Sequence, residues 1–123
     1  MKLNDYEYLL NKIYQNGVYQ ASNIDADFYK KMQMEYKNLN LGSLGANQMD
    51  GEFAFRKSFL IVRNYVQKAI QDGLRNFKYT MDASDINKLS YMVALLNRNF
   101  FDKRGLDQII STANTVFSQY NVN

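Results

Sequence analysis

Apolar residues in this chain recur every three or four positions along five separate segments, and this spacing is the period of an α-helix. Proline, the residue that most strongly interrupts a helix, is absent from the sequence. Residues 18–20, the best candidate for a strand, are too few to form one of consequence. The sequence therefore predicts an all-α fold, with a small bundle of about five helices in a single domain over residues 1–123.

The five predicted helices cover about residues 5–15, 23–38, 50–72 or 50–79, 83–101 and 106–120. Gly73 either ends the third helix or lies inside it at a cost of about 1 kcal/mol relative to alanine, and both alternatives stay open. We expect Gly17 to close the first helix in a left-handed conformation. Ser22 is expected to cap the second helix, and residues 40–47, rich in glycine and asparagine, to form a loop and hinge.

The residue types present exclude several kinds of chemistry. The sequence contains neither cysteine nor histidine, so it has no thiolate nucleophile, no disulfide and no imidazole to act as a base or metal ligand. Asp82 and Asp85 have the spacing of a helix cap, which explains that carboxylate pair without catalysis. The glycines at 42 and 45 lack the strand and the Gly-Lys-Ser/Thr sequence of a phosphate-binding loop. We expect no catalytic residue, no cofactor, no metal and no enzymatic activity.

The location of the protein is predicted from the absence of long apolar segments. No apolar stretch approaches the length that spans a bilayer, and the first residues do not have the pattern of a signal peptide. We therefore expect a cytoplasmic protein that does not bind membranes. The abundance of asparagine, lysine and tyrosine, all with AT-rich codons, favours an origin in a low-GC bacterium, its phage or a mobile element.

Positive charge is concentrated in the third predicted helix and the residues just after it. Residues 53–80 contain a single acid, Asp72, and six basic residues: Arg56, Lys57, Arg63, Lys68, Arg75 and Lys78. Acids exceed bases in residues 1–52, and the two balance in residues 81–123. On a helix, residues 56–75 would span roughly 30 Å. This basic ridge either meets a polyanion or an acidic protein, or is a solvated face whose cations pair with acids elsewhere, for example in residues 1–52.

Tyrosine is the second candidate for a contact residue. The chain has ten tyrosines, too many for all of them to lie in the core of a protein of this size. Tyrosine is enriched in contact surfaces because its ring is apolar and its hydroxyl is polar. Tyr8 and Tyr29 fall near the polar edges of their predicted helices, so we expect both to be exposed contacts.

Three functional hypotheses follow from these observations. The first is a protein that binds another protein as an inhibitor, adaptor or assembly factor, for example an anti-CRISPR protein or a virion assembly chaperone. The second is a nucleic-acid-binding protein that uses the basic ridge. The third is a homo-oligomer in which the third helix forms a two-fold interface, and it is compatible with either of the other two.

Overall fold

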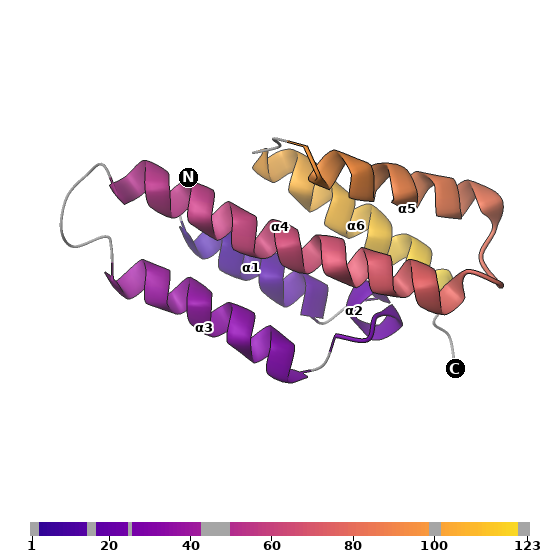
Figure 1. Ribbon diagram of the computed structural model, residues 1–123, viewed down its shortest axis with the longest axis horizontal. Helices are drawn as coiled ribbons and strands as arrows, with labels where there is room; N and C mark the ends of the chain where they lie inside the picture. Colours follow the sequence, from indigo (N-terminus) through magenta and orange to yellow (C-terminus); the bar gives the residue numbers. More distant parts are fainter. Residues whose placement is uncertain (1–2, 15–16, 25, 43–49, 99–101, 121–123) are drawn as a thin grey trace.

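The computed structural model describes residues 3–14, 17–24, 26–42, 50–98 and 102–120, and in these residues it is all-α with no strand. Figure 1 shows the arrangement of the helices. Their bounds are α1 Leu3–Tyr14, α2 Gly17–Ala21, α3 Ala26–Gly42, α4 Asp50–Phe77, α5 Ala83–Leu96 and α6 Lys103–Tyr120. The all-α prediction is confirmed. The described residues form six helices instead of about five. The additional helix is the short α2, which was not predicted.

Helix α4 is the element around which the others are arranged. It contacts each of the other five helices, and α3 and α5 lie on opposite sides of it (Figure 1). Helices α1 and α6 pack against α4 and against each other. The core side of α4 is therefore wide, and Phe59, Val62, Val66 and Ile70 on it are fully buried.

The apolar stripes predicted for α1 and α6 are confirmed as core. In α1, the residues Tyr6, Leu9, Leu10 and Ile13 are all buried. In α6 the buried apolar residues are Leu106, Ile109, Ile110, Ala113, Val116 and Phe117. Each large aliphatic or phenylalanine side chain buried in this way contributes about 1.5–3 kcal/mol of transfer free energy.

Gly73 lies inside α4, which settles the question of where that helix ends. The helix continues to Phe77. A Cβ atom added at Gly73 would come within 2.5 Å of Cζ of Phe117, whose ring is fully buried. The glycine is therefore needed so that a ring from α6 can approach the backbone of α4 closely.

Gly17 does not close α1 in a left-handed conformation, so that prediction is wrong. No described glycine has a positive φ, and Gly17 begins α2. A Cβ atom there would come within 2.7 Å of the carbonyl oxygen of Asn114 in α6. The backbone N–H of Val18 donates to Oδ1 of Asn114 at 2.9 Å. A five-residue helix is too short to be stable alone, so contact with α6 holds α2 in place.

The predicted start and end of α3 are also corrected. The helix begins at Ala26, so Ser22 is not its cap; the Ser22 hydroxyl donates to the carbonyl oxygen of Tyr19 at 2.8 Å and stabilises the preceding turn. At the other end, α3 continues to Gly42, so residues 40–42 of the predicted loop are helical. Residues 43–47 of that loop lie outside the described residues.

The capping pair predicted at the start of α5 does not form. Asp82 occupies the N-cap position, but its side chain makes no capping hydrogen bond. Instead, the hydroxyl of Tyr120 accepts a hydrogen bond from the backbone N–H of Asp82 at 3.1 Å and donates one to Oδ2 of Asp85 at 2.7 Å. The hydroxyl of Tyr120, the last residue of α6, thus bridges the two residues that were expected to form the cap.

Candidate functional site

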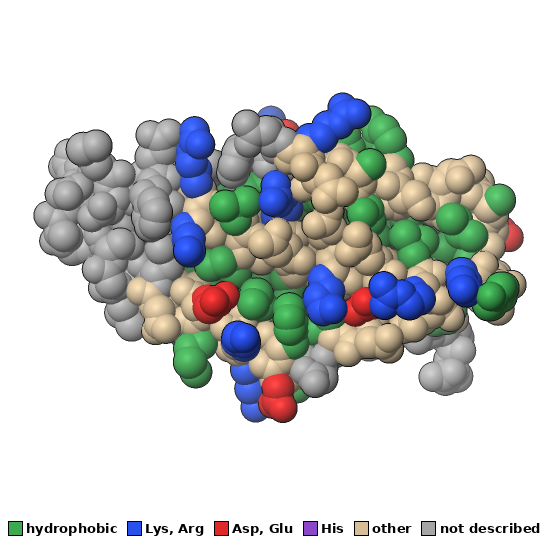
Figure 2. Space-filling view, viewed as in Figure 1, with side chains coloured by type: hydrophobic (Ala, Val, Ile, Leu, Met, Phe, Trp, Pro, Cys, Tyr) green, Lys and Arg blue, Asp and Glu red, His purple; other side chains and the backbone are tan. Residues whose placement is uncertain are grey.

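The predicted basic ridge lies mainly on the outward side of α4. Arg56, Lys57, Lys68 and Arg75 are exposed, as is Lys78 just after the helix ends. Lysine and arginine side chains gather over the face that contains α4 in Figure 2. Arg63 differs from the other five because it is half-buried, and its Nη1 donates to the carbonyl oxygen of Arg98 at 3.3 Å.

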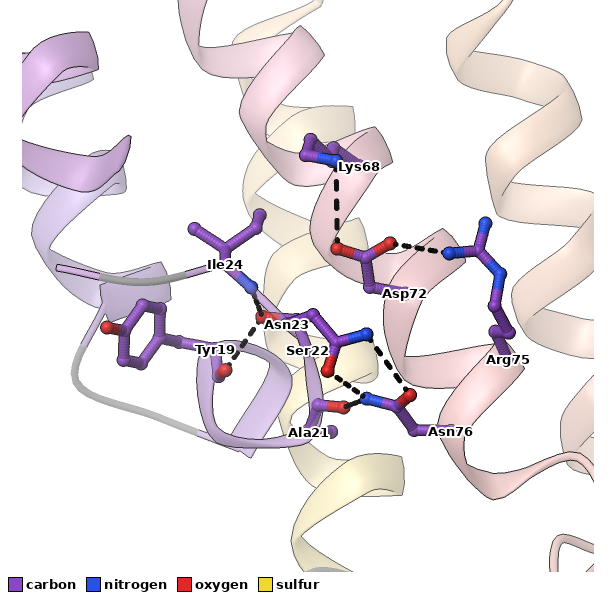
Figure 3. Close-up of polar contacts among 9 residues, drawn as sticks. All are labelled: Tyr19, Ala21, Ser22, Asn23, Ile24, Lys68, Asp72, Arg75 and Asn76. Carbon is purple, nitrogen blue, oxygen red and sulfur yellow. Dashed lines mark hydrogen bonds and ion pairs between the residues drawn. The ribbon is translucent and has the colours of Figure 1, made fainter. Parts of the chain in front are cut away.

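The middle of the ridge is partly neutralised by Asp72, a carboxylate only 4% exposed (Figure 3). Lys68 Nζ lies 3.8 Å and Arg75 Nη1 3.3 Å from its two oxygens. These two cations therefore pair with an acid of their own helix. Both remain at least half exposed, so the ridge stays positively charged toward solvent.

The end of the ridge is fixed by an amide pair beside Asp72 (Figure 3). Nδ2 of Asn76 donates to the carbonyl oxygen of Ala21 at 2.8 Å and to Oδ1 of Asn23 at 3.2 Å. The amide of Asn23 donates in return to Oδ1 of Asn76 at 3.4 Å. The segment after α2 is thereby joined to the C-terminal part of α4, and the position of the ridge relative to α2 is set.

The two tyrosines predicted to be exposed behave differently. Tyr8 is 60% exposed, whereas the prediction that Tyr29 is exposed is wrong, since it is 7% exposed. The Tyr29 ring lies 4.1 Å from that of Tyr14 and 6.0 Å from that of Tyr65, and its hydroxyl donates to Oδ1 of Asn11. Tyr29 is therefore buried within an aromatic cluster. The core side of α3 includes Tyr29 as well as the partly buried Phe28.

A groove between α5 and α6, which the sequence analysis did not identify, is the second candidate surface. Its apolar end has a volume of about 260 Å³ and is lined by Tyr91, Met92, Leu95, Gly105, Gln108, Ile109 and Thr112. A polar hollow of about 270 Å³ adjoins it, since Thr112 lines both, and includes Asp85 and Lys88 of α5. The two hollows together follow the α5–α6 pair along most of its length.

Helix α5 contributes apolar side chains to this groove that its contacts with other helices leave at least partly exposed. Its last six residues, 91–96, are all apolar, so apolar side chains point in every direction around the helix. Of these six, Leu96 is buried, while Tyr91 is 65% exposed. Helix α5 packs mainly on α4 and makes few contacts with α6. This unbroken apolar run was the sequence signal that could have predicted an exposed apolar surface.

The described residues contain neither a metal-binding cluster nor a membrane-crossing helix. They contain no group of three carboxylates placed to hold a metal ion. No helix in this part of the chain combines the length and apolarity needed to cross a bilayer.

The chain matches no protein-family model, no curated protein and no solved structure. The ridge on α4 and the groove between α5 and α6 are therefore the features from which a function is inferred.

Proposed function

We propose that this is a non-enzymatic protein that acts by binding another protein, as an inhibitor, adaptor or assembly factor, and that the α5–α6 groove is its contact surface. The observation that carries the proposal is the open apolar groove walled by Tyr91, Met92 and Leu95 of α5 and by Ile109 of α6. Apolar walls favour a partner that brings apolar side chains of its own.

The composition of the groove suits a protein partner on energetic grounds. Aromatic side chains at the centre of an interface contribute strongly to binding, and Tyr91 is exposed in the isolated chain. Gln108 and Thr112 provide hydrogen-bonding groups beside the apolar walls. An apolar centre with a polar rim is the usual composition of a protein interface.

Affinity capture from the native host tests the proposal, with nuclease-treated and untreated samples in parallel. We expect a protein partner whose recovery does not depend on nuclease and is lost with Tyr91→Ser. Tyr79→Ser is the matched control, because Tyr79 is 89% exposed but lies outside the groove. Repeated capture without any protein partner would contradict the proposal.

Nucleic-acid binding is a second candidate function, and the ridge on α4 favours it. The cations Arg56, Lys57, Lys68 and Arg75 are exposed there, and the carboxylate beside them, Asp72, is buried below the surface. Such a surface would bind phosphates with an affinity that falls steeply as salt is added.

A gel-shift assay at low salt distinguishes this candidate from a solvated helix face. The double variant Lys57→Glu/Arg75→Glu is expected to lose binding. The control, Lys30→Glu/Lys31→Glu, makes the same change in net charge at exposed positions on α3. Equal loss in the two double variants, or no binding by the unaltered protein, would eliminate the ridge as a nucleic-acid site.

The location and source of the protein form part of the same proposal. The proposed cytoplasmic location is compatible with the lack of cysteine, because no disulfide requires an oxidising compartment. An origin in a phage or mobile element is supported by the AT-rich codon preference of its commonest polar residues. Fractionation of the native host tests the location.

A further inference from the structure

Three cations of the ridge lie on one line along α4 together with two amides. These exposed residues, the α4 line, are Lys57, Asn64, Lys68, Gln71 and Arg75. Their separations of three, four and seven residues place them on the same side of the helix. The line rises about 27 Å from its first residue to its last. A long anion that follows it meets no exposed carboxylate of the described side chains of α4.

The acids near the α4 line leave it positively charged. Asp72, the single acid among residues 56–77, is 4% exposed and pairs with two of the cations. Lys78, just after the helix, adds a fourth cation, and Asp82 is the next exposed acid along the chain. Four cations against these two acids leave two net positive charges. Of the helices on either side, α3 has three lysines and two acids, and α5 has one of each, so neither cancels this charge.

An exposed aromatic ring follows the end of the α4 line. Tyr79 comes directly after Lys78 and is 89% exposed. Nζ of Lys78 lies 4.8 Å from the centre of the Tyr79 ring. The ring therefore offers a surface on which a base can stack, beside a cation that attracts the phosphate of that nucleotide.

The turn that carries Tyr79 is held in place by its neighbours. The backbone N–H groups of Thr80 and Met81 both donate to the carbonyl oxygen of Phe77, at 3.1 and 3.0 Å. The Phe77 ring lies 6.5 Å from that of Phe117, and Met81 is 7% exposed. The residues on both sides of Tyr79 are therefore packed against the core. Binding at Tyr79 does not have to pay for ordering a loose loop.

We propose that the α4 line and Tyr79 together bind single-stranded nucleic acid, with phosphates along the cations and an unpaired base stacked on the Tyr79 ring. This inference rests on the second candidate function, nucleic-acid binding by the ridge, and adds the class of strand. The bases of a duplex are paired and stacked on one another, whereas those of a single strand are free to stack on an aromatic side chain. An acidic protein surface would pair with the cations but would not need a stacking surface beside them.

Four probes separate the contribution of the phosphates from that of the bases. They are a single strand of about ten nucleotides, the same strand without its bases, a hairpin duplex with the same number of phosphates, and polyglutamate with the same number of charges. Each probe carries a fluorescent label. Its fluorescence anisotropy at low salt measures binding to the full chain.

The exposure of Tyr79 allows its ring to be changed without disturbing the core. Tyr79→Leu removes the stacking surface and keeps an apolar side chain, whereas Tyr79→Phe keeps the ring. Tyr8→Leu is the matched control, because Tyr8 is 60% exposed and belongs to α1. Circular dichroism of each variant establishes that it is folded.

The single strand should bind the unaltered protein at least about fivefold more tightly than the strand without bases, because stacking adds to the phosphate contacts. It should also bind more tightly than the duplex, although charge density alone favours the duplex. Tyr79→Leu should weaken binding of the single strand by at least about fivefold and leave binding of the strand without bases unchanged. Tyr79→Phe and Tyr8→Leu should each change binding by less than about twofold.

Equal binding of the strands with and without bases, or equal effects of Tyr79→Leu and Tyr8→Leu, would overturn the inference but leave the ridge as a phosphate-binding surface. Polyglutamate that binds as tightly as the single strand would also overturn it, by assigning the ridge to an acidic protein. The absence of binding to any nucleic acid would eliminate both the inference and the second candidate function.

Discussion

Several single residues affect the stability of this protein because they determine how closely two helices can pack. The ring of Phe117 lies against the backbone of α4 at Gly73, where an added Cβ atom would come within 2.5 Å of it. Around Tyr36 and Tyr65 the close packing has another consequence, because it removes phenol groups from water. The stability of the protein should therefore be sensitive to a methyl group added at Gly73 and to ionisation of the buried tyrosines at alkaline pH.

Gly73→Ala is expected to destabilise the protein by about 1–3 kcal/mol, although alanine favours a helix by about 1 kcal/mol over glycine. Urea denaturation followed by circular dichroism measures the change in the free energy of unfolding. In the double variant Gly73→Ala/Phe117→Leu the loss should be smaller than the sum of the two single losses, because leucine leaves room for the methyl group. A gain in stability from Gly73→Ala alone would show that the two helices are not in close contact.

The buried tyrosines predict a loss of stability at high pH. Burial raises the pKa of Tyr36 to about 12, and it also raises the pKa values of Tyr6 and Tyr65. In the unfolded chain each phenol ionises near pH 10. Their contribution to stability is therefore complete below pH 10 and is lost as the pH rises from there toward the folded-state pKa values. Each group reduces the free energy of unfolding by about 1.4 kcal/mol per pH unit in that range.

Urea denaturation at pH 8, 10 and 11 measures this effect. Tyrosinate absorbance, recorded in parallel, should show the exposed tyrosines titrating first and the buried ones ionising only as helicity is lost. Tyr36→Phe removes one such group and should make the decline with pH shallower. If all ten tyrosines ionise near pH 10 with the helices intact, the phenols are not buried as described.

At the scale of the helices, α2 shows how tertiary contacts create an element that local sequence does not predict. Its five residues are too few for a stable isolated helix, and its first turn depends on Asn114 of α6. The side-chain oxygen of Asn114 accepts a hydrogen bond from one of the N–H groups that every helix leaves unpaired at its start. Helix α2 is therefore stable only when α6 is in place.

Asn114→Ala should destabilise the protein by about 1–3 kcal/mol, because it leaves the buried N–H of Val18 without an acceptor. Asn114→Asp keeps a side-chain oxygen at this position and should retain more of the stability. Thermal unfolding of both variants, followed by circular dichroism, provides the comparison. Equal losses in the two variants would mean that the volume of the side chain matters and the hydrogen bond does not.

The accuracy of the sequence predictions also varied by helix. In α1 and α6 one apolar stripe faces one core, so the period of residues such as Leu10 and Ile110 identified the buried side correctly. In α3 the prediction for Tyr29 was wrong, because the apolar ring of tyrosine can lie in the core as readily as at a polar edge: Tyr29 is buried, as is Tyr36, while Phe28 is partly buried. The basic ridge could be predicted because its lysines and arginines are concentrated in one segment of the sequence. The α5–α6 groove could not, because it depends on the distance between two packed helices, which the spacing of apolar residues within each helix does not determine.

At the scale of the whole molecule, α4 connects all the described elements. Every other helix contacts it, and α5 is joined to the rest only through α4 and α6. The α4 ridge and the α5–α6 groove are therefore carried by one connected set of helices.

Because α4 contacts every other helix, we expect unfolding in one cooperative transition. The chain contains no tryptophan, so tyrosine fluorescence reports on the core, while circular dichroism reports on the helices. The two signals should give the same midpoint in urea. Different midpoints would show that a helix, most directly α5, unfolds independently of the others.

Hydrogen exchange of the protein bound to its captured partner tests the central claim most directly. We expect the partner to slow exchange in residues 88–95 of α5 and 104–112 of α6, which surround the apolar end of the groove, and to leave α3 unchanged. Slower exchange confined to α4, or to α3, with α5 and α6 unaffected, would contradict the assignment of the groove as the surface through which this protein acts.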